Sequence, residues 1–173
     1  MDERIETSLH TGLLIAVVGS LAWATGLPMV FPSLGPSAFV LALFPDGEAS
    51  NPRRVLGAHA IGVVAGLLAY QAFASGLVVT RSVPPFSATS LLLAASGVVS
   101  IVLTVAGMLS FDCSHPPACA TTLIVALGLL STVTGGAVIV ASVAVLLAAQ
   151  ALFLSSIGRS AALGTSGSDE NRL

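Results

Sequence analysis

The sequence predicts an all-α membrane protein with four long transmembrane helices and two shorter, proline-broken helices. Composition is the first reason, because 55% of the 173 residues are hydrophobic, 8% are charged and lysine is absent. A soluble domain averages roughly 25% charged residues. The low share of charged residues and the mean hydropathy of +0.99 leave too little polar surface for a water-soluble globule. Two further observations, the long gaps between charges and the clustering of prolines, divide the chain into six apolar segments.

Four charge-poor gaps each supply the roughly 20 apolar residues that a spanning helix needs. They predict long helices near 9–27, 54–79, 87–110 and 133–157. The two shorter apolar stretches, 33–45 and 115–130, contain prolines near their starts. Proline is well tolerated at the first position of a helix, so each stretch is expected to begin a short helix partway along an apolar segment.

The two proline-containing stretches also resemble each other. The frame from Phe31 to Ala38 recurs 80 residues later from Phe111 to Ala118, with the phenylalanine, one proline and the alanine in register. This predicts two repeat units, about 8–80 and 88–158, each made of a long, a broken short and a long helix. Interrupted segments at matching positions of two halves are typical of the binding site of a transporter.

Residues 1–160 are expected to form a single transmembrane domain, followed by a disordered polar tail at 161–173. The acidic N-terminus lacks the basic start of a cleaved signal peptide. Scarce basic residues argue against a nucleic-acid partner, because phosphate contacts need clustered lysine and arginine. The expected partners are therefore the lipid bilayer and a small solute.

The starts of the two short helices are the predicted substrate site. Irregular backbone survives at membrane depth only where it is buried in protein or lines a wet cavity, and a helix N-terminus offers free amides and a positive dipole to an anion. The alternative is that the prolines only set the helix starts and the serines are satisfied locally. The expected substrate-binding residues are Ser33, Gly35, Pro36, Ser37, Ser114, His115, Pro116, Pro117, Thr121 and His59.

Both histidines have two readings. His115 could donate a proton beside an anion or respond to pH, since its unperturbed pKa is near 6.5, or it could cap a helix or bond a carbonyl. His59 shares a helical face with Tyr70 and could border the pathway, or it could pair with a charge near an interface. That charge would be Arg53, Arg54 or Asp112.

The remaining charges and thiols favour structural roles. Asp112 is expected to form a salt bridge with Arg53 or Arg54 that joins the two halves. Cys113, His115 and Cys119 lack the second ligand pair of a metal site, so neither metal nor cofactor is expected. No catalytic grouping is recognisable at membrane depth, which argues against an enzyme.

Glycine spacing predicts close helix contacts. Gly12, Gly19 and Gly26 recur every seventh residue, and Gly62 and Gly66 form a GxxxG pair. These faces could pack helices within one chain or between the copies of a homo-oligomer.

Two runs resemble motifs of the HPP family of integral membrane proteins: Asp112 with 114–123, and 51–59 with its Pro-Arg and Gly-x-His residues. The resemblance covers roughly 5–157. It implies four membrane-spanning helices and a transporter or channel for a small solute, since some photosynthetic members are nitrite transporters. We therefore expect a transporter or channel for a small, nitrite-like inorganic anion; the alternative is a structural or assembly subunit without transport activity.

Orientation follows from the arginines. If the short segments cross fully, there are six crossings and five of the six arginines lie on the cytoplasmic side. If the short segments are re-entrant, there are four crossings and four arginines lie inside, so the positive-inside rule favours six. Six crossings would make the two halves inverted. Both versions place the N-terminus and the C-terminus in the cytoplasm, in a protein of the plasma membrane.

Overall fold

The computed structural model describes the backbone of residues 2–169 and the side chains of residues 2–156. Every regular element within that range is helical, which confirms the all-α class. Four helices are long and apolar enough to cross a membrane. Helix α6 continues along the backbone to Asp169, into the tail at 161–173 that was expected to be disordered; residues 170–173 lie outside the description, and disorder there stays a prediction.

The long helices match the four charge-poor gaps of the sequence. Asn51 accepts from the Arg53 amide at the start of α3, and Pro52 occupies its first turn. Ser87 caps α4 by accepting from the Ser90 amide, as expected for residues favoured at N-caps. The long helices are α1 Glu3–Thr25, α3 Pro52–Ala69 with the π turn Tyr70–Ala74, α4 Ala88–Ser110 and α6 Val133–Asp169.

The short helices cover fewer residues than the apolar stretches that predicted them. Helix α2 spans Leu34–Leu43, and α5 spans Ala118–Ala126. Helix α5 begins after Pro117, later than the predicted stretch 115–130, because the amides of residues 118, 119 and 120 donate to carbonyls three residues earlier and so form a tighter turn before the α-helix. The residues between α4 and α5 form an irregular loop that extends to Pro117.

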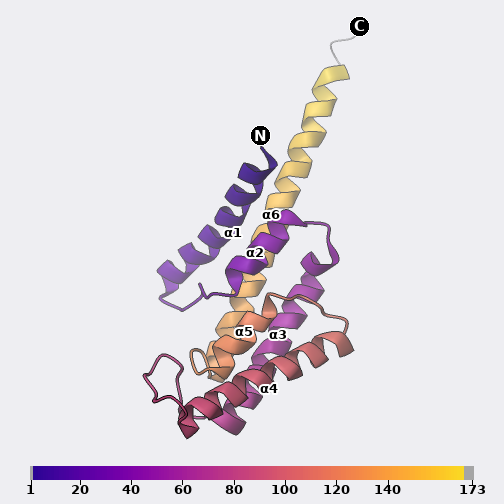
Figure 1. The fold of residues 1–173 in the computed structure, drawn as a ribbon. Helices are drawn as coiled ribbons and strands as arrows, with labels where there is room; N and C mark the ends of the chain where they lie inside the picture. The colour runs from indigo at the N-terminus through magenta and orange to yellow at the C-terminus, as the bar shows by residue number, and fades with distance from the viewer. Residues whose placement is uncertain (1, 170–173) are drawn as a thin grey trace.

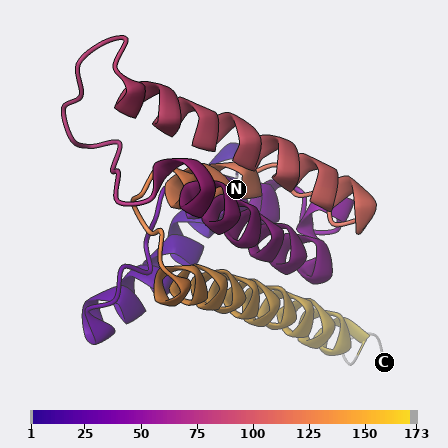
Figure 2. The same cartoon turned by 90° about the horizontal axis from the view of Figure 1, so that it is seen from below.

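Helix α3 is the centre of the bundle. It packs against α4, α5 and α6, whereas α1 packs against α2 and α6. Figure 1 shows α1 and α2 beside the middle of α6, and α4 crossing the lower part of the molecule. Seen from below, α4 and α6 lie on opposite sides, with α3 and α5 between them (Figure 2).

Each short helix runs back toward the end of the bundle at which the preceding long helix began. Glu3 at the start of α1 and Leu43 at the end of α2 line the same surface hollow. At the opposite end of α3, the Val79 amide donates to the Leu127 carbonyl just after α5, at 3.0 Å. The N-termini of α2 and α5 therefore point into the bundle, and their C-termini point toward its two ends.

The packed core is aliphatic along α1, α2, α3 and α6. Leu14, Leu34, Val55 and Leu146 are fully buried within it. Many other large apolar side chains face outward, such as Trp23 with 89% of its surface exposed. Exposed apolar surface of this extent is expected for a protein whose outer surface contacts lipid tails.

Candidate functional site

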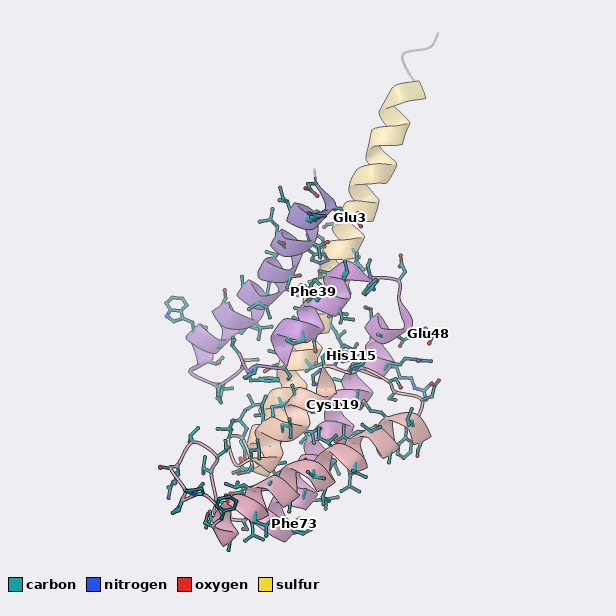
Figure 3. The ribbon with its side chains drawn as sticks, viewed as in Figure 1. Glu3, Phe39, Glu48, Phe73, His115 and Cys119 are labelled. Atoms are coloured by element: carbon teal, nitrogen blue, oxygen red, sulfur yellow. The ribbon has the colours of Figure 1, made fainter. Side chains whose placement is uncertain are left out.

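Five of the predicted site residues meet in the interior of the bundle. Ser33, Ser37, His59, His115 and Thr121 each have 0% of their surface exposed. They are joined to one another by hydrogen bonds, and we call this group the histidine–hydroxyl network. Figure 3 shows His115 near mid-height of the ribbon, where α5 begins.

The network joins the first turns of the two short helices. Ser33 immediately precedes α2, and its hydroxyl lies 2.6 Å from the Thr121 hydroxyl on α5. One turn along α2, the Ser37 hydroxyl lies 3.0 Å from Nε2 of His115, just before α5. Residues 78 to 88 positions apart in the chain thus bring the two helix N-termini together.

His59 of α3 lies between the two short helices and bonds to both. Its Nδ1 lies 2.7 Å from the Thr121 hydroxyl, and its Nε2 lies 3.1 Å from the Ser37 hydroxyl. The rings of His59 and His115 are 5.4 Å apart between centroids. His59 was expected either to border a pathway or to pair with a nearby charge; it bonds to hydroxyl groups, so the pairing with a charge is wrong.

His115 connects the network to a loop that sequence reasoning did not find. Its Nδ1 lies 2.7 Å from the backbone carbonyl of Ala49, in the short 3-10 helix Glu48–Ser50. Ala49 has no polar side chain, so no sequence signal marked it. His115 therefore bonds a backbone carbonyl, as expected if its role is structural. It also lies where the two short helices start, as expected if it belongs to a binding site.

Close contact between α3 and α5 holds the network in place. A Cβ atom added at Gly62 would lie 2.8 Å from the Thr122 hydroxyl, and one added at Gly66 would lie 2.8 Å from Val125. The GxxxG pair therefore packs helices within the chain. Thr122 in turn lies 2.8 Å from the hydroxyl of Thr104 on α4.

The other five predicted site residues lie outside the network. Gly35, Pro36 and Pro116 are exposed, and Ser114 and Pro117 are half-buried. The backbone amides at the start of α5 already have partners, since those of residues 118, 119 and 120 donate to the carbonyls of residues 115, 116 and 117. In this conformation, the groups that meet at the helix starts are therefore side-chain hydroxyls and imidazoles.

A salt bridge fastens the two halves of the chain, as the sequence predicted. Arg54 at the start of α3 lies 3.1 Å from Asp112, which follows α4, and 3.1 Å from Glu48. These charges lie near the surface, with both carboxylates largely exposed. Within the described side chains, no three histidine, cysteine or acidic residues form a group that could hold a metal ion.

Comparison with known proteins identifies the family. The family model described as HPP, transmembrane region, matches residues 1–162. The chain belongs to the HPP family. The resemblance drawn from the sequence motifs is thereby confirmed, and this HPP protein is an integral membrane protein with four apolar helices long enough to span a bilayer. No curated protein and no solved structure matches it.

Proposed function

We propose that this HPP protein is a transporter or channel for a small inorganic anion of nitrite-like size, bound where the first turns of α2 and α5 meet. The observation that supports this most is the histidine–hydroxyl network. Five fully buried polar side chains from distant parts of the chain converge between two helix starts. A protein that served only as an anchor would have no need of such a group.

Energetics support a functional role for the network. Polar and ionisable groups at membrane depth are costly, and they usually mark pathways of ions or substrates. Both short helices direct the positive end of their dipoles at the network, and discontinuous helices serve anionic substrates in this way in other transporters. Neutral hydroxyl donors would bind an anion firmly enough to replace water yet weakly enough to release it.

Transport through this site requires a conformational change. Each network side chain is inaccessible to solvent, and its polar atoms bond to one another or to the protein backbone. We infer that opening the bundle toward one side breaks some of these bonds, and that the freed hydroxyl and imidazole donors bind the anion. The proposal includes no catalytic step and no cofactor.

The expected duplication supports the same reading. Pro36 of α2 and Pro116 before α5 belong to matching frames of the two proposed repeat units, and the structure brings those two helix starts into contact. We propose inverted halves around one shared site, in a protein of the plasma membrane with both termini cytoplasmic. Gly62 and Gly66 contact α5 of the same chain, so they are not available to a second copy. If the protein forms a homo-oligomer, the copies would meet through other, outward-facing surfaces.

Uptake into liposomes tests the proposal. The purified protein would be reconstituted and supplied with nitrite, nitrate, formate or chloride, with protein-free liposomes as the reference. The wild type should take up at least one of these anions well above the reference, and Ser37→Ala should lose about tenfold or more of that uptake.

The control is Ser20→Ala, since Ser20 is exposed on α1 and its hydroxyl donates to the Ala16 carbonyl of its own helix. It should insert and transport as the wild type does. Uptake at the protein-free rate for all four anions would reject transport and favour the structural or assembly subunit.

A further inference from the structure

The direction of every hydrogen bond in the network follows from one carbonyl. The Ala49 carbonyl can only accept, so Nδ1 of His115 must carry a proton and donate to it. Neutral His115 then has a bare Nε2, which must accept. Its partner is the Ser37 hydroxyl at 3.0 Å, so Ser37 donates to His115.

The same reasoning continues to the far end of the network. Ser37 has a single hydroxyl proton, so Nε2 of His59 must donate to the Ser37 oxygen. Neutral His59 therefore accepts at Nδ1 from Thr121, and the Thr121 oxygen accepts from Ser33. With both histidines neutral, all five bonds run in one direction, from Ser33 to Ala49.

Ser37 has a second acceptor within reach. Its hydroxyl lies 3.0 Å from the backbone carbonyl of Ser33, which equals its distance from Nε2 of His115. If His115 gained a proton on Nε2, the Ser37 oxygen would accept from both histidines and its own proton would turn to the Ser33 carbonyl. Every donor would again have an acceptor, and the other bonds would stay unchanged.

His59 offers no equivalent arrangement. A proton on its Nδ1 would make Thr121 an acceptor and turn the Thr121 proton toward Ser33. The Ser33 hydroxyl would then need another acceptor, and no hydrogen bond of the described side chains supplies one. The geometry therefore distinguishes the two histidines, and a second proton would place like charges on rings only 5.4 Å apart.

We propose that the network binds one proton, on Nε2 of His115, and that this proton crosses the membrane together with the anion. This inference rests on the proposed transport function and names its coupling ion. The proton adds to the imidazole lone pair without breaking a covalent bond, and it leaves from the same nitrogen when the anion is released. One proton with one monovalent anion makes each transport cycle electrically neutral.

Coupling between the two ions follows from charge. The neutral network has no formal positive charge to attract an anion, whereas the network protonated on His115 has one. A proton without an anion would place a positive charge beside the positive ends of α2 and α5, which oppose it. Each ion therefore favours binding of the other, and this coupling is reciprocal by thermodynamic necessity.

Other titratable groups on the elements around the network have separate partners. Arg54 of α3 pairs with Glu48 and Asp112 near the surface. Cys113 donates to the Phe111 carbonyl, and the Tyr70 hydroxyl accepts from the Gly76 amide. Cys119 is half-buried on α5, and the groups that face the two imidazoles directly are the hydroxyls and the Ala49 carbonyl.

Proteoliposomes with an entrapped pH-sensitive dye test the proposal. Nitrate is the probe, because as the anion of a strong acid it does not cross the bilayer in neutral form, and valinomycin with potassium sets the voltage. In the wild type, nitrate uptake should acidify the lumen by about one proton per nitrate and should not respond to voltage. His115→Gln should lose this acidification, either with the uptake or while uptake continues and becomes voltage-dependent.

The matched control is His10→Gln, because His10 is also a buried histidine but stacks on Phe153, away from the network. It should keep both uptake and acidification. Wild-type nitrate uptake without acidification would overturn the coupling and leave anion transport intact, as would one-to-one coupling in His115→Gln. Absence of uptake for every anion tested in the wild type would instead reject the transport function, and the coupling with it.

Nitrogen-15 NMR of the imidazoles gives an independent reading of the proton site. As the pH falls, His115 should become doubly protonated while His59 stays neutral. Protonation of His59 before His115 would contradict the assignment.

Discussion

Gly62 and Gly66 allow α3 and α5 to approach each other closely. Their spacing indicated a close helix contact, but a GxxxG pair does not say which helix approaches it. The structure places both glycines against α5, with the Ala118 carbonyl 3.0 Å from the position of an added Cβ at Gly62. By contrast, Gly12 of the predicted seven-residue series has nothing within 4 Å of that position, and Gly26 ends α1 with φ of 69°.

Alanine substitution should separate these two kinds of glycine. Gly62→Ala would force a methyl group against Thr122 and the α5 backbone, and overpacking of this kind costs about 1–3 kcal/mol. Gly12→Ala should leave stability unchanged or raise it by about 0.5–1 kcal/mol, because a helical glycine is replaced in open space. Unfolding in detergent measures both, and equal stabilities for the two variants would contradict the close contact.

Asp112 combines an ion pair with an unusual backbone conformation. Its φ of 50° suits asparagine and aspartate far better than a β-branched residue. Asp112→Asn should therefore cost less than about 1 kcal/mol, the usual worth of an exposed salt bridge. Asp112→Val removes the same charge and should cost roughly 1–2 kcal/mol more, so similar unfolding midpoints for the two variants would show that the turn is not constrained.

Much of the candidate site could be predicted from residue types. Ser33, Ser37, His115 and Thr121 stood out because they lie at the two proline-containing helix starts, and His59 stood out as an ionisable residue on a helical face with Tyr70. Their mutual bonds could not be predicted, because each bond depends on how three separate helices pack. The role of the Ala49 carbonyl as the partner of His115 could not be predicted from the sequence, since every residue has a backbone carbonyl.

At the scale of elements, the four long helices were predictable because a charge is costly inside a bilayer. The gaps between charges therefore set their limits to within a few residues at most ends. The short helices were less predictable, because a proline can precede a helix or lie in its first turn. Pro36 is the third residue of α2, whereas Pro117 precedes α5.

A hydroxyl pair tests how α4 is fastened to α5. Thr122 also donates to the Ala118 carbonyl at 3.2 Å, so its oxygen accepts from Thr104 at 2.8 Å. Thr122→Val removes both bonds and should cost about 1 kcal/mol. Thr104→Val leaves Thr122 with its carbonyl and should cost less than half as much, as measured by unfolding in detergent; the reverse order would contradict this direction of donation.

At the scale of the whole molecule, the ends of the helices bear on the number of crossings. The end of α2 lies beside the start of α1, and the end of α5 lies beside residues that follow α3. This is the arrangement expected if both short segments complete a crossing together with the irregular backbone before them. The proposed duplication rests in the sequence on a frame of three matching residues, because apolar positions tolerate almost any apolar replacement.

Cysteine labelling can decide between six crossings and four. In a background carrying Cys113→Ala and Cys119→Ala, a single cysteine would replace Asp46 or Arg81, and intact cells would receive a membrane-impermeant maleimide. With the N-terminus in the cytoplasm, as proposed, six crossings predict that position 81 is labelled from outside and position 46 is protected, whereas four crossings predict the opposite. The unsubstituted background serves as the control for non-specific labelling.

The chain of hydrogen bonds from Ser33 to Ala49 also bears on proton leakage across the membrane. A row of hydroxyls and imidazoles inside a bilayer is a conductor in principle, because protons hop along such rows. Here the row stops at a peptide carbonyl, which cannot pass a proton onward, and water reaches none of its side chains. In the described conformation this row therefore offers protons no continuous path across the molecule, although it places polar groups in the protein interior.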